Sequence, residues 1–146
     1  MPLPQNHPVR DFTPGSPERA ALIAELDRQR ANPRRILPVI NGKPVDTGTS
    51  TDMREPHAHS RTLGSYASAG AAETEAAIRA AVEARHDWAR TSPSSRRAVF
   101  LRAAELLAGP FNARLLAATM LQQSKTAYQA EIDASCELID FLRFNV

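Results

Sequence analysis

The chain has 146 residues, enough for one domain with a buried core, and 42% of them are hydrophobic. Lysine and arginine number 18 and aspartate and glutamate 16. This near-balance argues against a nucleic-acid-binding protein, and the pairs Arg34-Arg35 and Arg96-Arg97 are too short to change that. Cys136 is the single cysteine, which excludes an internal disulfide bond and indicates a reducing compartment.

Targeting and membrane signals are absent from the amino-acid pattern. No stretch approaches the roughly 18 consecutive apolar residues that cross a bilayer. The first residues, MPLPQNHPVRDF, have no apolar segment of a secretory signal. An organelle transit peptide would be poor in acids, unlike the segment with Asp11, Glu18, Glu25 and Asp27. We therefore expect a soluble cytoplasmic protein with no membrane partner, and the mitochondrial matrix is the alternative.

The first 33 residues are predicted to form an arm and a helix. Residues 1–15 are a proline-rich arm that should lie on something else rather than fold alone. Ser16 is placed to cap a helix with Pro17 at its first position, and this helix should end before Pro33. Three residues share one face at helical spacing: Ile23, Leu26 and Arg30.

A hairpin is predicted next. Asn41-Gly42 between short apolar runs is a strong turn signal, because both turn residues must tolerate positive φ. Pro38 and Pro44 confine the flanking strands to the edge of a sheet. Another extended segment is expected at about residues 61–66. Such a small sheet is marginal alone and needs a larger sheet or a partner subunit beside it.

The alanine-rich remainder is predicted to be helical, so the segment as a whole is mostly α-helical with a small edge β-hairpin. Caps and helix breakers give the boundaries. The first expected helix has Gly70 as its cap, and one of its faces carries Ile78, Ala81, Val82, Arg85 and Trp88. The second begins at Ser92-Pro93 and ends at Gly109-Pro110, and the third runs from Phe111 to about Leu121. The last begins at Ser124 or Thr126 and ends near Asn145.

Two short motifs suggest ligand sites, a phosphate loop and a metal site, but neither has all the residues that such a site requires. Ser124-Lys125-Thr126 is similar to the end of a phosphate loop, but such a loop needs glycine at Ser124 and five residues earlier, so a helix start is the better interpretation. His57 and His59 would share one face of a strand. A stable zinc site needs three or four ligands, and none nearby completes the set, so no metal site is predicted.

The last helix contains a cysteine and three spaced carboxylates. Cys136 lies on the apolar stripe with Ile132 and Ile139, and neighbouring carboxylates should raise its pKa, so we predict a buried packing residue rather than a nucleophile.

Three acidic residues of the same helix, Asp133, Glu137 and Asp140, fall at positions i, i+4 and i+7. Arg143 can pair with Asp140, three residues before it. Periodicity leaves two alternatives open for Glu137: a solvated acidic face, or a carboxylate aimed into a pocket or at a partner helix.

Several stretches together resemble the aldehyde dehydrogenase superfamily. They are ILPVINGKPVDTG, EPHAHSRTLGSYASA and HDWARTSPSSRRAVFLRAAELLAG. The tail AATMLQQSKTAYQAEIDASCELIDFLRFN is similar to the 1-pyrroline-5-carboxylate dehydrogenase branch, also called L-glutamate γ-semialdehyde dehydrogenase. The resemblance extends from about Val9 onward. One departure is Gln122, where the family usually has glycine, and it puts the local turn geometry in question.

The resemblance implies an α/β aldehyde dehydrogenase fold and an NAD-dependent oxidation of L-glutamate γ-semialdehyde to L-glutamate in proline catabolism, by an enzyme that is a homo-oligomer at full length. In the family, a cysteine thiolate attacks the aldehyde, hydride passes to NAD, and a glutamate-activated water releases the acid. Glu137 matches the family's glutamate that lines the substrate tunnel. The catalytic cysteine, the glutamate base and the cofactor-binding lysine have no counterpart here, so no catalytic, cofactor-binding or metal residue is assigned.

These implications lead to two rival expectations. In the first, residues 16–146 are the incomplete amino-terminal part of an NAD-binding domain, inactive alone, and the last helices expose apolar faces. In the second, the chain is a non-catalytic helical interaction or oligomerisation module derived from an aldehyde dehydrogenase.

Overall fold

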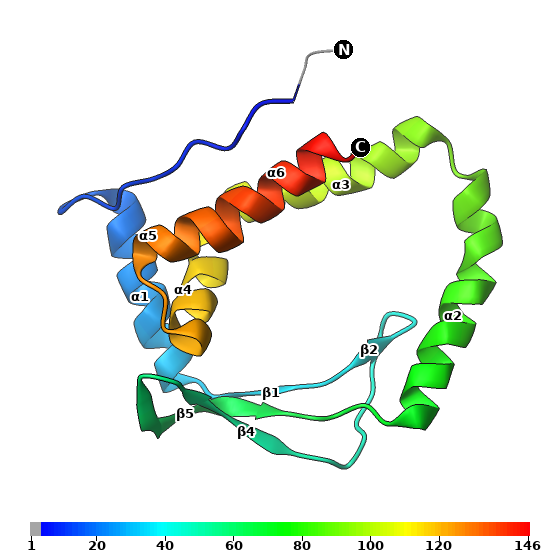
Figure 1. The fold of residues 1–146 in the computed structure, drawn as a ribbon, viewed down its shortest axis with the longest axis horizontal. Coiled ribbons are helices and arrows are strands. Elements are labelled where there is room, and N and C mark those ends of the chain that lie inside the picture. Colours follow the sequence, from blue (N-terminus) through cyan, green and yellow to red (C-terminus); the bar gives the residue numbers. More distant parts are fainter. Residues whose placement is uncertain (1–3) are drawn as a thin grey trace.

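The computed structural model describes residues 4–146, which form an open ring of helices closed on one side by a small sheet (Figure 1). It contains the helical content and the small sheet expected from the sequence. The elements, in chain order, are α1 (Pro17–Ala31), β1 (Arg34–Ile36), β2 (Val39–Ile40), β3 (Lys43–Pro44), β4 (Thr51–Glu55), β5 (Ala58–Tyr66), α2 (Ala71–Arg90), α3 (Pro93–Ala108), α4 (Asn112–Gln123), α5 (Ala127–Ala130), the π-helical turn η1 (Glu131–Cys136) and α6 (Glu137–Phe144).

Helix α1 has the predicted ends. The Ser16 hydroxyl accepts a hydrogen bond from the backbone N–H of Arg19, and Pro17 occupies the first turn. Of the residues at helical spacing, Ile23 is 49% exposed, whereas Leu22, one position earlier, is buried. Leu22 and Leu26 are the residues that pack toward α4 and the core.

The sheet has three strands in the order β1-β5-β4, with β5 in the middle. β4 is antiparallel to β5, and β1 runs parallel to β5 with Arg34 opposite Gly64. The predicted hairpin forms a separate two-stranded sheet, β2-β3, and Asn41 and Gly42 in its turn both have positive φ, at 49° and 73°. The parallel pairing was not predicted, since it joins strands from different predicted units.

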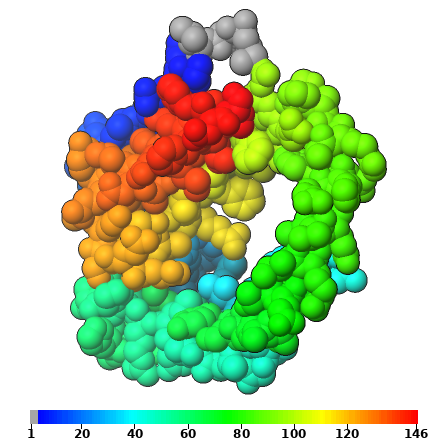
Figure 2. Space-filling view, turned by 45° about the vertical axis from the view of Figure 1, so that its right-hand side comes forward, coloured from blue at the N-terminus to red at the C-terminus, as the bar shows by residue number. Residues whose placement is uncertain are grey.

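Helix α2 has the predicted start and an unusual environment. Gly70 is its cap, and its backbone N–H donates to the carboxylate of Glu73 at 2.8 Å. No residue of Ala71–Arg90 is buried, and Ile78 and Val82 are 58% and 54% exposed. The helix crosses one side of the ring, and an opening separates it from the α4 side of the molecule (Figure 2).

Helices α3 and α4 begin and end close to the predicted residues. Ser92 caps α3 by accepting from the backbone N–H of Ser95, and Gly109 ends it. The Gln122 departure does not disturb the turn, because Gln122 lies within α4 and the residue with positive φ is Ser124, at 55°. Of the two predicted starts of the last helix, Thr126 is the cap: its hydroxyl accepts from the backbone N–H of Gln129.

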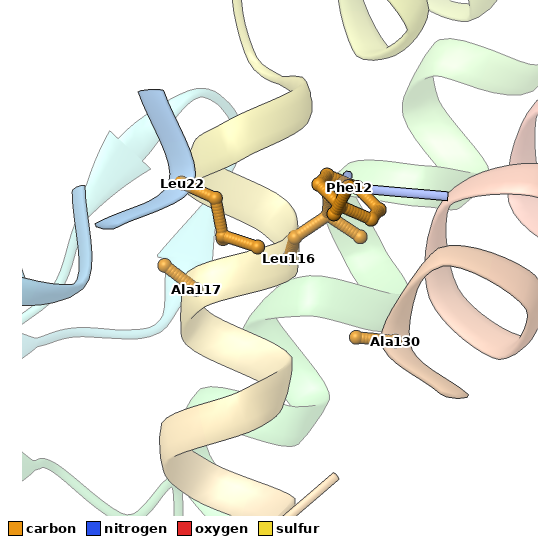
Figure 3. Packing of buried hydrophobic residues seen from close by; sticks show 5 residues of the cluster. All are labelled: Phe12, Leu22, Leu116, Ala117 and Ala130. Carbon is orange, nitrogen blue, oxygen red and sulfur yellow. The ribbon is translucent and has the colours of Figure 1, made fainter. Parts of the chain in front are cut away.

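The central core joins the arm, α1, α4 and α5 (Figure 3). Leu116 and Ala117 on α4 are fully buried, and Phe12 from the arm is 7% exposed. The described part of the arm, residues 4–15, therefore lies on the rest of the molecule instead of folding alone, and it contributes a side chain to the core. Within residues 4–146, no helix combines the length and the apolarity needed to cross a membrane.

Candidate functional site

Glu137 opens α6 on the surface of the molecule. It lines a shallow hollow of about 310 Å³ together with Asn6 from the arm and Asp140, Phe141 and Phe144 from α6. Phe141 and Phe144 are 56% and 49% exposed, so the hollow has an apolar wall beside its carboxylates. This arrangement favours the alternative in which Glu137 borders a pocket, although the side chain itself remains exposed.

Asp140, which lines the hollow, forms hydrogen bonds with the arm. Its two carboxylate oxygens accept hydrogen bonds from the Asn6 side-chain amide at 2.8 Å and from the backbone N–H of His7 at 2.7 Å. Arg143 lies 3.9 Å from the same carboxylate, so the pairing expected at i+3 is present. Asp140 is thus oriented by the arm, whereas Glu137, three residues earlier, faces the hollow.

The predicted stripe of three carboxylates is divided. Asp133 forms an ion pair with Lys125 at 2.9 Å in the connection before α5, whereas Glu137 and Asp140 line the hollow. The expectation of one continuous stripe was wrong because the helix is not α-helical between them. A π-helical turn, Glu131–Cys136, separates the two groups.

Glu131 is the functional candidate that sequence reasoning missed. It is fully buried, and its Oε1 accepts from the backbone N–H of Arg10 at 3.2 Å. Its Oε2 has no hydrogen-bond partner among the described residues, and burial raises the pKa of the carboxyl. A signal was available, because Glu131, Ser135 and the apolar Ile139 follow at intervals of four.

Cys136 lies at the end of the π turn and is buried, as predicted. Burial is the main cause that raises the pKa of its thiol to about 11, and the charges of Glu131 and Asp140 add to it. The thiol is therefore protonated near neutral pH, and a protonated thiol is a poor nucleophile. Cys136 is a packing residue in this structure.

The two histidines do not share a strand face, contrary to the prediction. His57 lies in the turn before β5, whereas His59 lies within β5. The ring of His57 contacts Glu55 Oε2 at 3.1 Å and the Ser124 hydroxyl at 2.9 Å. Within the part of the chain that the structure describes, no three side chains of the metal-binding types come together.

NAD would need a cradle for its pyrophosphate, commonly a glycine-rich turn that leads into a helix. The connection from β5 to α2 contains one glycine, Gly70. The carboxylate of Glu73 already accepts a hydrogen bond from the backbone N–H of Gly70. A negative group at this helix start would repel phosphate. In the connection before α5, Lys125 is paired with Asp133. The described residues do not fit a complete dinucleotide site.

The chain is similar to known proteins over nearly its whole length. A family model described as "Aldehyde dehydrogenase family" matches residues 43–146. A delta-1-pyrroline-5-carboxylate dehydrogenase of Agaricus bisporus is 40% identical over 147 residues, and a mitochondrial one of Bos taurus is 43% identical over 140 residues. These alignments cover 100% and 96% of this chain and 27% and 25% of the two relatives, so the chain spans about a quarter of their length.

A solved structure supports the same relationship. The delta-pyrroline-5-carboxylate dehydrogenase of Mycobacterium tuberculosis, in a crystal structure bound with NAD, matches with a TM-score of 0.96 and 49% identity. The match covers 99% of this chain and 27% of that one. The sequence motifs, the fold and the family match agree, and the chain belongs to the aldehyde dehydrogenase family.

Proposed function

We propose that this chain is the amino-terminal part of an NAD-dependent dehydrogenase that oxidises L-glutamate γ-semialdehyde to L-glutamate in proline catabolism. The observation that carries the proposal is the match of nearly the whole chain, at 40% to 49% identity, to enzymes named for 1-pyrroline-5-carboxylate. Residues 16–146 would belong to the NAD-binding domain, with residues 1–15 as an arm. NAD is the proposed cofactor, because a relative binds it.

Glu137 is the proposed substrate-binding residue of this segment. It faces a hollow with an apolar wall, and Asp140 at the edge of this hollow is fixed by two hydrogen bonds from the arm. A carboxylate can accept hydrogen bonds from the ammonium group of a glutamate derivative. We propose that Glu137 lines the path by which the semialdehyde reaches the reacting centre.

The chemical steps require groups outside this segment. The thiol of Cys136 is buried and protonated, and the described residues hold no complete site for NAD. Residues of this chain would bind and orient the substrate, and NAD, held by residues outside this segment, would supply the hydride acceptor. We propose that the chain by itself has no dehydrogenase activity.

Turnover tests this division directly. The purified chain, mixed with NAD and L-glutamate γ-semialdehyde, should produce no reduced cofactor above background. A chimera in which residues 1–146 replace the matching quarter of the Mycobacterium tuberculosis enzyme should oxidise the semialdehyde. The unaltered enzyme is the reference. Turnover by the isolated chain would contradict its proposed incompleteness, and an inactive but folded, NAD-binding chimera would contradict the proposed function.

In the active chimera, Glu137→Gln should lower kcat/KM for the semialdehyde by about 10- to 100-fold, because a charged hydrogen bond to the substrate is lost. Asp133→Asn is the matched control, since Asp133 pairs with Lys125 away from the hollow. Steady-state kinetics with NAD at saturation measure both variants. Equal kcat/KM in Glu137→Gln and the parent would remove Glu137 from the site.

Location and assembly remain parts of the proposal. We propose the cytoplasm as the location, and the mitochondrial matrix is the alternative that the name of the Bos taurus relative favours. A homo-oligomer is proposed for the full-length protein. Neither nucleic acid nor a membrane is a proposed partner.

A non-catalytic interaction module is the second candidate function. It is favoured by helix α2, which has no buried residue and exposes Ile78, Val82 and Trp88. Clusters of exposed apolar side chains commonly mark surfaces that bind another protein or another part of the same chain. An inactive chimera together with a stable, cooperatively unfolding dimer of the isolated chain would favour this function over the enzyme.

A further inference from the structure

The backbone at Glu137 belongs to the π turn that precedes it. The N–H of Glu137 donates to the carbonyl oxygen of Ile132, five residues back, instead of to Asp133 as in an α-helix. The direction in which Glu137 leaves the helix therefore depends on this turn staying π-helical. Turns of this kind are uncommon and occur frequently at functional sites, so the groups that hold the turn are of interest.

A series of hydrogen-bonded side chains, Arg10, Asn112 and Ser135, leads from the arm to the turn. The Arg10 guanidinium donates to Asn112 Oδ1 at 2.5 Å and to the carbonyl oxygen of Ala108 at 2.9 Å. Asn112 Nδ2 in turn donates to the hydroxyl of Ser135 at 2.6 Å. Asn112 is 4% exposed and Ser135 is fully buried, so water does not compete for the hydrogen bond between them, whereas the two bonds from Arg10 are partly buried.

Different residues of the arm reach the two sides of the turn. The backbone N–H of Arg10 binds Glu131, the first residue of the turn, and the arm binds Asp140, one helical turn beyond Glu137. Glu131, Ser135 and Asp140 are thus held at three points along one helix. Glu137 lies between the last two, without a hydrogen bond of its own to the arm among the described residues.

We infer that Arg10, Asn112 and Ser135 are positioning residues, which hold the π turn and so direct Glu137 into the substrate hollow. This inference rests on the proposed role of Glu137 in the function given above. None of the three touches the hollow, whose lining is Asn6, Glu137, Asp140, Phe141 and Phe144. They act on the substrate through Glu137.

Ser135→Ala and Asn112→Asp form an informative pair of variants in the active chimera. Alanine at 135 leaves the buried amide of Asn112 without an acceptor, which should release the turn. Aspartate at 112 keeps both links, because its carboxylate accepts from Arg10 and from the Ser135 hydroxyl. Ser135→Ala should lower kcat/KM for the semialdehyde about tenfold or more, whereas Asn112→Asp should stay within about twofold. Ser60→Ala, at an exposed serine of β5, is the control.

A double-mutant cycle separates positioning from a general loss of stability. If Ser135 acts through Glu137, Ser135→Ala should have almost no further effect on kcat/KM once Glu137→Gln is present. An equal effect of Ser135→Ala in both backgrounds overturns the inference and leaves the role of Glu137 intact. An unchanged kcat/KM in Glu137→Gln alone removes the proposed role of Glu137, and the inference with it.

The thiol of Cys136 gives a readout that does not depend on activity. Cys136 ends the turn and is 7% exposed, so its alkylation by iodoacetamide reports opening of the turn. Mass spectrometry of the peptide that contains Cys136 should show faster alkylation in Ser135→Ala and an unchanged rate in Asn112→Asp and Ser60→Ala. Equal rates in all four proteins would show that Arg10, Asn112 and Ser135 do not hold the turn, which overturns the inference.

Discussion

Replacing Gly64 with alanine is expected to lower the free energy of unfolding by at least about 3 kcal/mol. A Cβ at this position would lie 2.0 Å from the carbonyl oxygen and 2.6 Å from the nitrogen of Arg34. Both atoms belong to the backbone of β1, so no side chain can rotate away to make room. Gly64 also has φ of 145°, a conformation that residues with a side chain rarely adopt. β1 would have to separate from β5, which is its partner in the sheet.

Gly48→Ala is the matched control for this experiment. Gly48 also has positive φ, at 75°, but a Cβ there meets no atom within 4 Å, so only the conformational cost of about 1 kcal/mol is expected. Urea unfolding followed by far-ultraviolet circular dichroism measures both variants against the parent chain. Equal losses of stability in the two variants would show that the contact between β1 and β5 is not the cause.

Glu55→Gln is expected to lower the free energy of unfolding by about 2 kcal/mol at neutral pH, because it removes a buried charge from three cationic or ionisable partners. Glu55 is fully buried at the end of β4. Its carboxylate lies 2.8 Å from Arg30 Nε, 3.1 Å from His57 Nε2 and 3.6 Å from Arg61 Nη1. These partners remain partly exposed and can be rehydrated, which keeps the expected loss moderate.

The pH dependence of stability distinguishes this carboxylate from a neutral hydrogen-bonding group. The hydrogen bond from Arg30 is the main cause that lowers the pKa of Glu55 below its ordinary 4.5, against the opposing effect of burial. Its contribution is therefore complete above pH 4.5 and is lost as the pH falls through the lowered pKa. The stability difference between the parent chain and Glu55→Gln should shrink over that acidic range.

The control for Glu55 is an exposed ion pair on the same strand. Asp52 lies 3.1 Å from Arg54, and both side chains are more than half exposed. Asp52→Asn should change the free energy of unfolding by less than about 1 kcal/mol, because water screens such pairs. Urea unfolding at several pH values measures both variants. A loss of stability in Glu55→Gln that stays constant down to the most acidic pH would contradict the assignment.

Sequence reasoning succeeded where structure depends on neighbours a few residues apart. Ser16 and Ser92 cap their helices because each hydroxyl needs only a backbone N–H three residues ahead. The hairpin at Asn41-Gly42 is equally local, since the two residues supply the required positive φ themselves. The burial of Cys136 also followed from its apolar neighbours on the helix.

The missed features depend on contacts between distant parts of the chain. The π turn changes the helical period, so a stripe drawn at α-helical spacing cannot place Asp133 relative to Glu137. Glu131 is buried although it is acidic, and it accepts a hydrogen bond from the backbone of Arg10, more than a hundred residues away. The need for glycine at position 64 likewise becomes clear only when β1 lies beside β5. In the candidate site, Glu137 was identified from the sequence, whereas Arg10, Asn112 and Ser135 were not.

The position of the arm sets an order of events during synthesis. Asn6 and His7 find their acceptor on Asp140, 134 and 133 residues further along the chain. At translation rates of about 5 to 20 residues per second, the arm waits on the order of ten seconds before that acceptor exists. Asn6 and His7 therefore leave the ribosome well before the residue that fixes them, and until the later helices are made Phe12 lacks the side chains that bury it.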